Sequence, residues 1–115
     1  MPLSPNKRRI KMFDRGSRFI TRGINSELPF KLHCILWQIL DEFMANRKHK
    51  RIDYLQVLRI HKEKDYIKII HSQEAPLYKK EIILKRNDII LERSQYKIFI
   101  IDDGEHSTMM LAEEY

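Results

Sequence analysis

The chain has 115 residues, of which 43% are hydrophobic and 33% charged, and its formal net charge is +6. That length suits one domain, because a chain of this size buries most of its apolar surface without a disulfide or a metal ion. A single cysteine, Cys34, excludes an intramolecular disulfide. The longest apolar runs are far short of the roughly 20 residues that a membrane-spanning helix needs. We therefore expect a cytoplasmic protein with no membrane partner.

The positive charge is concentrated at the N-terminus. Residues 1–24 hold seven lysines and arginines against one aspartate, whereas residues 25–115 hold fifteen basic and fifteen acidic side chains. Residues 1–16 contain two prolines and a basic run but no apolar period. This composition predicts a flexible basic arm, followed by a single domain over residues 17–115.

The first predicted elements are a short strand and a long helix. Residues 17–24 alternate weakly and are rich in β-branched side chains, which predicts a strand ending at Gly23. Asn25 or Ser26 is then expected to cap a helix over residues 29–46. We expect one face of this helix to lie on a sheet. That face carries Leu32, Ile35, Leu36, Ile39 and Phe43.

After a basic turn at residues 47–51 the chain changes to β character. Strands are predicted over residues 53–61, 65–73, 77–84, 89–91, 96–101 and 108–111. The connections are too short for crossovers, which need a dozen or more residues, so the sheet should be mainly antiparallel. The sequence therefore predicts an α+β domain of two layers, with about five or six strands and one long amphipathic helix.

A second apolar strip lies on the predicted helix beside the face expected on the sheet. Phe30, Trp37 and Met44 are seven residues apart, so they share one side of the helix. Either a flanking segment folds over them, or they form a surface for a protein partner or a second copy of the chain. We favour the partner surface, because aromatic and methionine side chains are enriched at interface cores.

Basic side chains outside the arm offer a site for an anion or for nucleic acid. Arg22 precedes Gly23 near the predicted start of the helix, where its guanidinium could bind an anion. We favour instead an ion pair between Arg22 and the acidic C-terminus. The turn after the helix holds four more basic residues, Arg47, Lys48, Lys50 and Arg51. Together with the arm they could bind phosphates without sequence preference.

The only credible metal or acid–base site combines residues from two distant segments. His71 could meet His106 if their strands are neighbours, and Asp102 or Asp103 would complete the set. Adjacent strand residues point to opposite faces, however, and an Asp-Gly pair between apolar runs is typical of a hairpin turn. We therefore favour a turn after Asp102, and for His71 a hydrogen bond across the sheet. No cofactor is expected, since the sequence holds no phosphate-binding motif such as G-x-x-x-x-G-K.

Five blocks of the sequence carry a resemblance to a known family. They are FITRGI (19–24), LPFKLHCILWQILDEF (28–43), DYLQV (53–57), KIIHSQEAPLY (68–78) and IFIIDDGEHSTMMLAEEY (98–115). In this order they resemble the bacterial family catalogued as domain of unknown function nine-sixty, which is found in Gram-positive bacteria. The resemblance runs from about Met12 to the last residue. It implies a cytoplasmic bacterial protein and carries no activity, cofactor or partner.

The function that these patterns favour is a non-catalytic binding or regulatory module, with Phe30, Trp37 and Met44 on its partner surface. Enzyme sites usually combine convergent polar residues with special backbone, and the sequence shows little of either. The first alternative is a nucleic-acid-associated protein that uses the arm and the turn at residues 47–51. The second is a metal-assisted hydrolase built on the two histidines and an aspartate.

Overall fold

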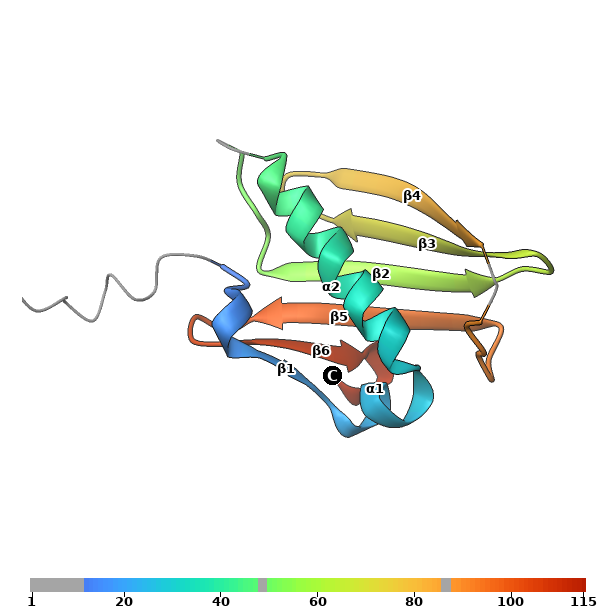
Figure 1. Cartoon of the computed structure of the whole chain (residues 1–115). Coiled ribbons are helices and arrows are strands. Elements are labelled where there is room, and N and C mark those ends of the chain that lie inside the picture. Colours follow the sequence, from blue (N-terminus) through green and yellow to red (C-terminus); the bar gives the residue numbers. More distant parts are fainter. Residues whose placement is uncertain (1–11, 48–49, 86–87) are drawn as a thin grey trace, which may run out of the picture.

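The computed structural model describes residues 12–47, 50–85 and 88–115. The elements are η2 (Arg15–Ser17), β1 (Arg18–Ile20), α1 (Arg22–Glu27), α2 (Phe30–Ala45), β2 (Leu55–Lys62), β3 (Tyr66–Gln73), β4 (Tyr78–Lys85), β5 (Gln95–Asp102), β6 (Ser107–Leu111) and η3 (Ala112–Glu114). The six strands form one sheet, and both α-helices lie on the same side of it (Figure 1). This two-layer arrangement confirms the predicted α+β class. Within the described residues, none of the helices combines the length and apolar composition that crossing a membrane requires.

The sheet has the strand order β1-β6-β5-β2-β3-β4. Four of its five pairings are antiparallel, as predicted, and β1 pairs with β6 in parallel, with Arg18 opposite Ser107. Short connections join the β2–β3, β3–β4 and β5–β6 pairs, whereas the antiparallel partners β2 and β5 have β3 and β4 between them in the chain. The parallel pair was not predicted from connection lengths, because the whole of the domain between β1 and β6 connects these two strands.

One predicted strand is wrong. Residues 89–91 run as a loop between β4 and β5 and pair with no strand. Ile89 and Leu91 are nevertheless only 4% and 3% exposed, since they pack into the core. The short apolar run therefore indicates that these residues are buried, but it does not distinguish a strand from a buried loop.

The predicted strand before the helix ends three residues early. The chain leaves β1 after Ile20, and Thr21 caps the short helix α1 by accepting a hydrogen bond from the N–H of Ile24 at 3.3 Å. Asn25 and Ser26, the predicted caps of the long helix, lie inside α1. The long helix α2 starts after Pro29 without a side-chain cap.

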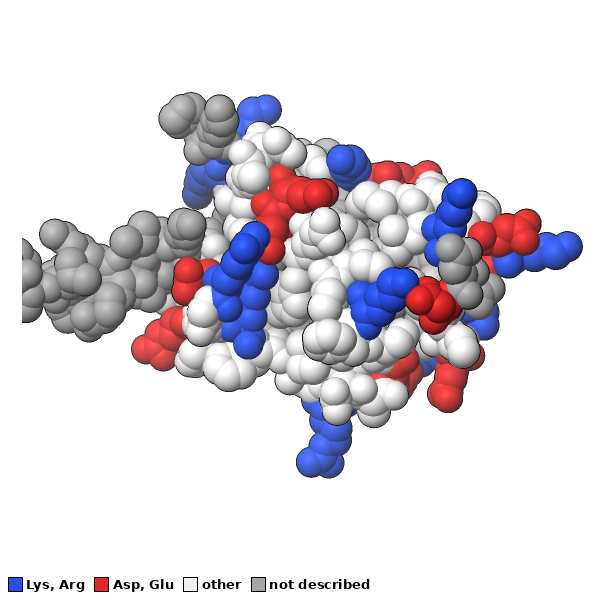
Figure 2. Space-filling model, in the orientation of Figure 1, with Lys and Arg blue, Asp and Glu red and all other residues white. Residues whose placement is uncertain are grey.

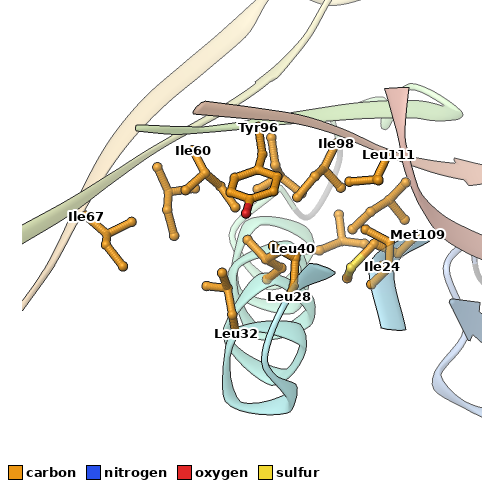
Figure 3. Packing of buried hydrophobic residues seen from close by; sticks show 14 of the residues in the cluster. Ile24, Leu28, Leu32, Leu40, Ile60, Ile67, Tyr96, Ile98, Met109 and Leu111 are labelled. Carbon is orange, nitrogen blue, oxygen red and sulfur yellow. The ribbon is translucent and has the colours of Figure 1, made fainter. Parts of the chain in front are cut away.

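The core lies between α2 and the sheet, where side chains from both layers interdigitate (Figure 3). The buried residues of α2 are Leu32, His33, Leu36, Leu40 and Phe43. Ile35 and Ile39, predicted on the buried face, pack only at its margin. The face is rotated because Leu32, Leu36 and Leu40 form one ridge of residues four apart, which fits along the sheet.

The domain includes residues that the sequence assigns to the arm. Phe13 is 1% exposed and belongs to the core. Its N–H donates to the Asp102 carboxylate at 2.6 Å, which ties this segment to the end of β5. A single aromatic residue outside any periodic pattern gives no signal of burial in the sequence. The remainder of the predicted arm, residues 1–11, lies outside the described residues.

Candidate functional site

The predicted strip of Phe30, Trp37 and Met44 does not form one exposed patch. Phe30 is 76% exposed, whereas Trp37 and Met44 pack partly against the core. The guanidinium of Arg18 lies 4.6 Å from the centroid of the Trp37 ring, and Met44 shares a surface pocket with residues 12–15. Arg18 therefore packs over Trp37, Met44 lies beside residues 12–15, and Phe30 is the most exposed of the three residues.

The histidines and aspartates of the predicted metal site are not brought together. His71 lies buried on β3 and bonds to Gln56 of β2 at 2.7 Å, which confirms its predicted hydrogen bond across the sheet. Asp102, Asp103 and His106 lie at the turn between β5 and β6, and β2 and β5 separate β3 from β6. Among the described residues no group of three or more His, Cys, Asp or Glu side chains is placed to hold a metal ion. The described residues therefore do not assemble the metal site that the hydrolase hypothesis requires.

The two aspartates instead bind backbone groups of the turn. Asp102 accepts hydrogen bonds from the N–H of Phe13 at 2.6 Å and of Gly104 at 2.8 Å. Asp103 accepts from the N–H of His106 and of the residue before it, and these bonds lower the pKa of Asp103 to about 2. Gly104 has a φ of 101°, the left-handed conformation that a glycine adopts without strain. The predicted turn is confirmed, and its two carboxylates accept hydrogen bonds from backbone N–H groups.

The predicted anion site at Arg22 is also taken by the chain itself. Arg22 is exposed on α1, and the ion pair expected between Arg22 and the acidic C-terminus is not formed among the described residues. The Glu114 carboxylate accepts from the Thr21 hydroxyl at 2.6 Å and from the Gly23 N–H at 3.0 Å. The start of α1 therefore already binds an anion, and that anion is Glu114.

The basic turn after α2 does not present its cations in one row. Arg47 points inward and is 9% exposed, whereas Lys50 and Arg51 are exposed. Lys48 lies outside the described residues. The turn therefore divides its basic groups between a buried and an exposed environment.

The structure reveals a surface that the sequence did not indicate, which we call the distal face. It is the side of the sheet away from α2, and alternate residues of each strand point toward it. On β1, β6, β5 and β2 its apolar residues are Phe19, Leu55, Val57, Phe99, Ile101 and Met110. The register places Phe99 between Val57 and Met110 on neighbouring strands. Both α-helices lie on the other side of the sheet, and exposure on the distal face varies, since Phe19 is 54% exposed and Val57 is 9% exposed.

The remainder of the distal face mixes basic and apolar side chains, because Ile70 lies between Arg59 and Glu81 and Ile83 lies opposite Lys68. Its strand residues include five cations and one carboxylate, namely Arg59, Lys68, Lys79, Lys85, Lys97 and Glu81. Arg59 lies directly opposite Lys97 in the antiparallel pair of β2 and β5. None of the five cations forms an ion pair with another described residue. This half of the sheet therefore carries an uncompensated positive charge.

The helix side of the molecule differs from the distal face in its charges. Acidic and basic side chains are interspersed there around a largely uncharged centre (Figure 2). Arg93 binds Glu27 at 2.7 Å and Glu113 at 2.9 Å, which joins the β4–β5 loop to α1 and η3. The equal numbers of acids and bases in residues 25–115 thus conceal a separation of charge between two faces. Alternation within each strand indicates which side chains share a face. The register between strands is needed to show that the cations of different strands lie side by side.

The comparisons with known proteins agree with this fold. The family model DUF960, described as a staphylococcal protein of unknown function, matches residues 17–114. The chain belongs to the DUF960 family. The resemblance in the sequence is thereby confirmed. A crystal structure of a protein of unknown function from Enterococcus faecalis is similar to the chain, with a TM-score of 0.77 and 25% identity.

That similarity covers 92% of this chain and 97% of the Enterococcus faecalis chain. Among curated proteins none matches. Membership of the DUF960 family therefore supports the fold and a bacterial protein.

Proposed function

We propose that the protein is a non-catalytic binding module that binds single-stranded nucleic acid across the distal face. The observation that carries the proposal is the direct pairing of Arg59 with Lys97 among five cations and one carboxylate. Like charges opposite each other destabilise a sheet, so this pair is costly to the fold by itself. A phosphate backbone lying on the face would offset the repulsion by neutralising these cations.

Aromatic side chains accompany the cations on the distal face. Phe19 is 54% exposed and Tyr115 is 79% exposed, and the ring of Tyr115 meets that of Phe99 edge-on at 5.7 Å between centroids. The Lys97 amine lies 5.5 Å from the centroid of the Phe99 ring. Proteins that bind single strands combine basic groups for the backbone with aromatic rings on which bases stack. The open sheet offers both within one surface.

The positions of the candidate acid–base residues support a binding role. His71 is buried on one part of the sheet and His106 lies at an exposed turn of another. Asp102 and Asp103 accept hydrogen bonds from the backbone. These groups are therefore committed to the fold and do not converge on a reacting centre.

The proposal is tested by fluorescence anisotropy of a labelled oligouridine titrated with the protein at several salt concentrations. Arg59→Gln and Lys97→Gln should each weaken binding and reduce the salt dependence by about 0.7, the slope per phosphate contact for single strands. Arg22→Gln is the matched control, because it removes an exposed arginine from the helix side. It should leave the affinity and the salt slope unchanged.

Two results would contradict the proposal. One is an absence of binding at low salt, which would leave the distal face to another partner, such as an acidic protein. The other is an equal loss of affinity in Arg22→Gln and Arg59→Gln, because binding would then follow the net charge of the chain and not the distal face.

A protein partner at Phe30 is a second candidate function. Phe30 and Ile90 are 76% and 79% exposed and line the same surface pocket beside the start of α2. Exposed apolar side chains that gather at one place are typical of interaction surfaces. Phe30→Ser should leave the free energy of unfolding nearly unchanged and abolish any self-association seen by sedimentation velocity. Self-association that survives this substitution would contradict a contact at Phe30.

A further inference from the structure

A cavity of about 590 Å³ opens between the C-terminal half of α2 and strands β3 and β4. Its size is within the range of small-molecule sites. Its walls include Phe43, Arg47, Lys50, His71, Tyr78 and Lys80. The cavity lies on the helix side of the sheet, so it is separate from the distal face and independent of the function proposed for that face.

Arg47 is a buried cation without an anion. Its side chain is 9% exposed and lies over two aromatic rings, 4.8 Å from the centroid of Phe43 and 5.5 Å from that of Tyr78. Its Nε donates to the carbonyl oxygen of Arg51 at 3.2 Å, and among the described residues it forms no ion pair. Burying a charge is costly unless it is paired. The remaining donors of this guanidinium therefore favour an anionic ligand in the cavity.

His71 supplies an unpartnered polar atom on the same wall. The side chain is 1% exposed, and its Nε2 lies 2.7 Å from Oε1 of Gln56. The amide nitrogen of Gln56 donates to the carbonyl of Asp53 and to Oε1 of Gln73, so its oxygen accepts from His71. The imidazole proton is thus on Nε2, and Nδ1 is an acceptor with no partner among the described residues.

The charges around the cavity are mainly positive. Lys50 and Lys80 line it together with Arg47, against one carboxylate, that of Glu42. Burial, followed by the positive charges of Arg47 and Lys80, lowers the pKa of His71 to about 4. The field of the cations therefore reaches the buried wall of the cavity.

We propose that this cavity binds a small phosphate monoester. Arg47 and Lys80 bind the phosphate, because a guanidinium presents paired donors that match phosphate oxygens and an ammonium adds a second positive charge. Phe43 and Tyr78 provide the apolar wall for the organic part of the ligand. Nδ1 of His71 accepts a hydrogen bond from the P–OH group of the singly protonated phosphate, which gives that acceptor a partner.

The probe for this site is phenyl phosphate, titrated into the isotopically labelled protein while the ring resonances of His71 are followed by NMR. Phenol and sodium chloride at matched ionic strength are the blanks. In the wild type, phenyl phosphate should shift the His71 resonances saturably, and neither phenol nor sodium chloride should do so. Lys80→Gln should weaken binding about tenfold, as should Arg47→Gln if it folds. Arg51→Gln should bind as the wild type does, since it removes an exposed arginine outside the cavity wall.

Three outcomes would overturn the proposal. A response to phenyl phosphate no larger than the response to chloride would exclude the site. Equal affinity for phenol would show that the aromatic wall binds without the phosphate. Equal weakening in Arg51→Gln and Lys80→Gln would assign the binding to net charge. Because Lys80 is exposed, Lys80→Gln keeps the test decisive even if Arg47→Gln unfolds.

Discussion

Replacing Gly23 by alanine tests how the C-terminus holds the start of α1. A Cβ at position 23 would lie 2.6 Å from the Glu114 carboxylate. That carboxylate accepts hydrogen bonds from the Thr21 hydroxyl at 2.6 Å, the Gly23 N–H at 3.0 Å and the Leu111 N–H at 2.9 Å. Gly23→Ala should therefore displace the carboxylate and weaken all three bonds.

Two opposing effects set the magnitude. Hydrogen bonds to a charged acceptor contribute about 1.5–3 kcal/mol each when shielded, but Glu114 is exposed, so we expect about 1–2 kcal/mol for the three together. Alanine is better than glycine inside a helix by about 0.5–1 kcal/mol. Gly23→Ala should thus lower the free energy of unfolding of the wild type by up to about 1.5 kcal/mol. In a Glu114→Ala background the clash is gone, and the same substitution should raise it by about 0.5–1 kcal/mol.

The measurement is a double-mutant cycle by chemical denaturation of the wild type, both single variants and the double variant. The pKa of Glu114 is lowered, first by the Thr21 hydroxyl, so its contribution is present above the ordinary pKa of 4.5 and is lost as the pH falls through the lowered value. The coupling between the two sites should disappear in acid with it. If Gly23→Ala changes the free energy of unfolding in the same direction in both backgrounds, the Glu114 carboxylate does not hold the start of α1.

Three further predictions concern buried groups. Because the folded state keeps His71 neutral down to about pH 4, against 6.5 for the free side chain, the free energy of unfolding should fall by up to about 3 kcal/mol as the pH drops through that interval; His71→Gln should flatten this part of the pH profile. Arg18→Leu removes donors to Asp41 and to the Phe13 carbonyl, so denaturation should show a loss of about 1–3 kcal/mol and the emission of Trp37, the single tryptophan, should change; an unchanged spectrum would contradict the contact. Phe13→Ala should cost about 3–5 kcal/mol in the same assay, whereas its exposed match Phe19→Ala should cost under about 1 kcal/mol; equal costs would contradict burial of residue 13.

Local patterns predicted most of the secondary structure, for a physical reason. The period of α2, the alternation in β2 and β3 and the Asp-Gly turn after Asp102 each depend on residues close together in the chain. Such features form from short-range geometry, so they are visible without a tertiary structure. The same patterns failed at residues 89–91, because a short apolar run is buried equally well in a loop and in a strand.

The candidate sites depended on distances that no local pattern encodes. The sequence allowed a contact between His71 and His106, and the strand order separates them. It named Arg47 as an anion ligand, but the aromatic rings beneath it and the unpartnered nitrogen of His71 come from other elements. Of the predicted basic residues that the structure describes, Arg47 and Lys50 line the cavity, and Lys80 joins them from β4.

Periodicity and turn chemistry are local properties, so the amino-acid sequence was enough to predict one small α+β domain with a long helix and hairpins. Only the tertiary structure decided that β1 pairs with β6, that Phe13 is buried and that Glu114 binds the start of α1. It also decided that five cations share the distal face, although residues 25–115 carry no net charge. Each of these depends on strand order and register, which bring together residues far apart in the chain and leave no trace in the composition of any one segment.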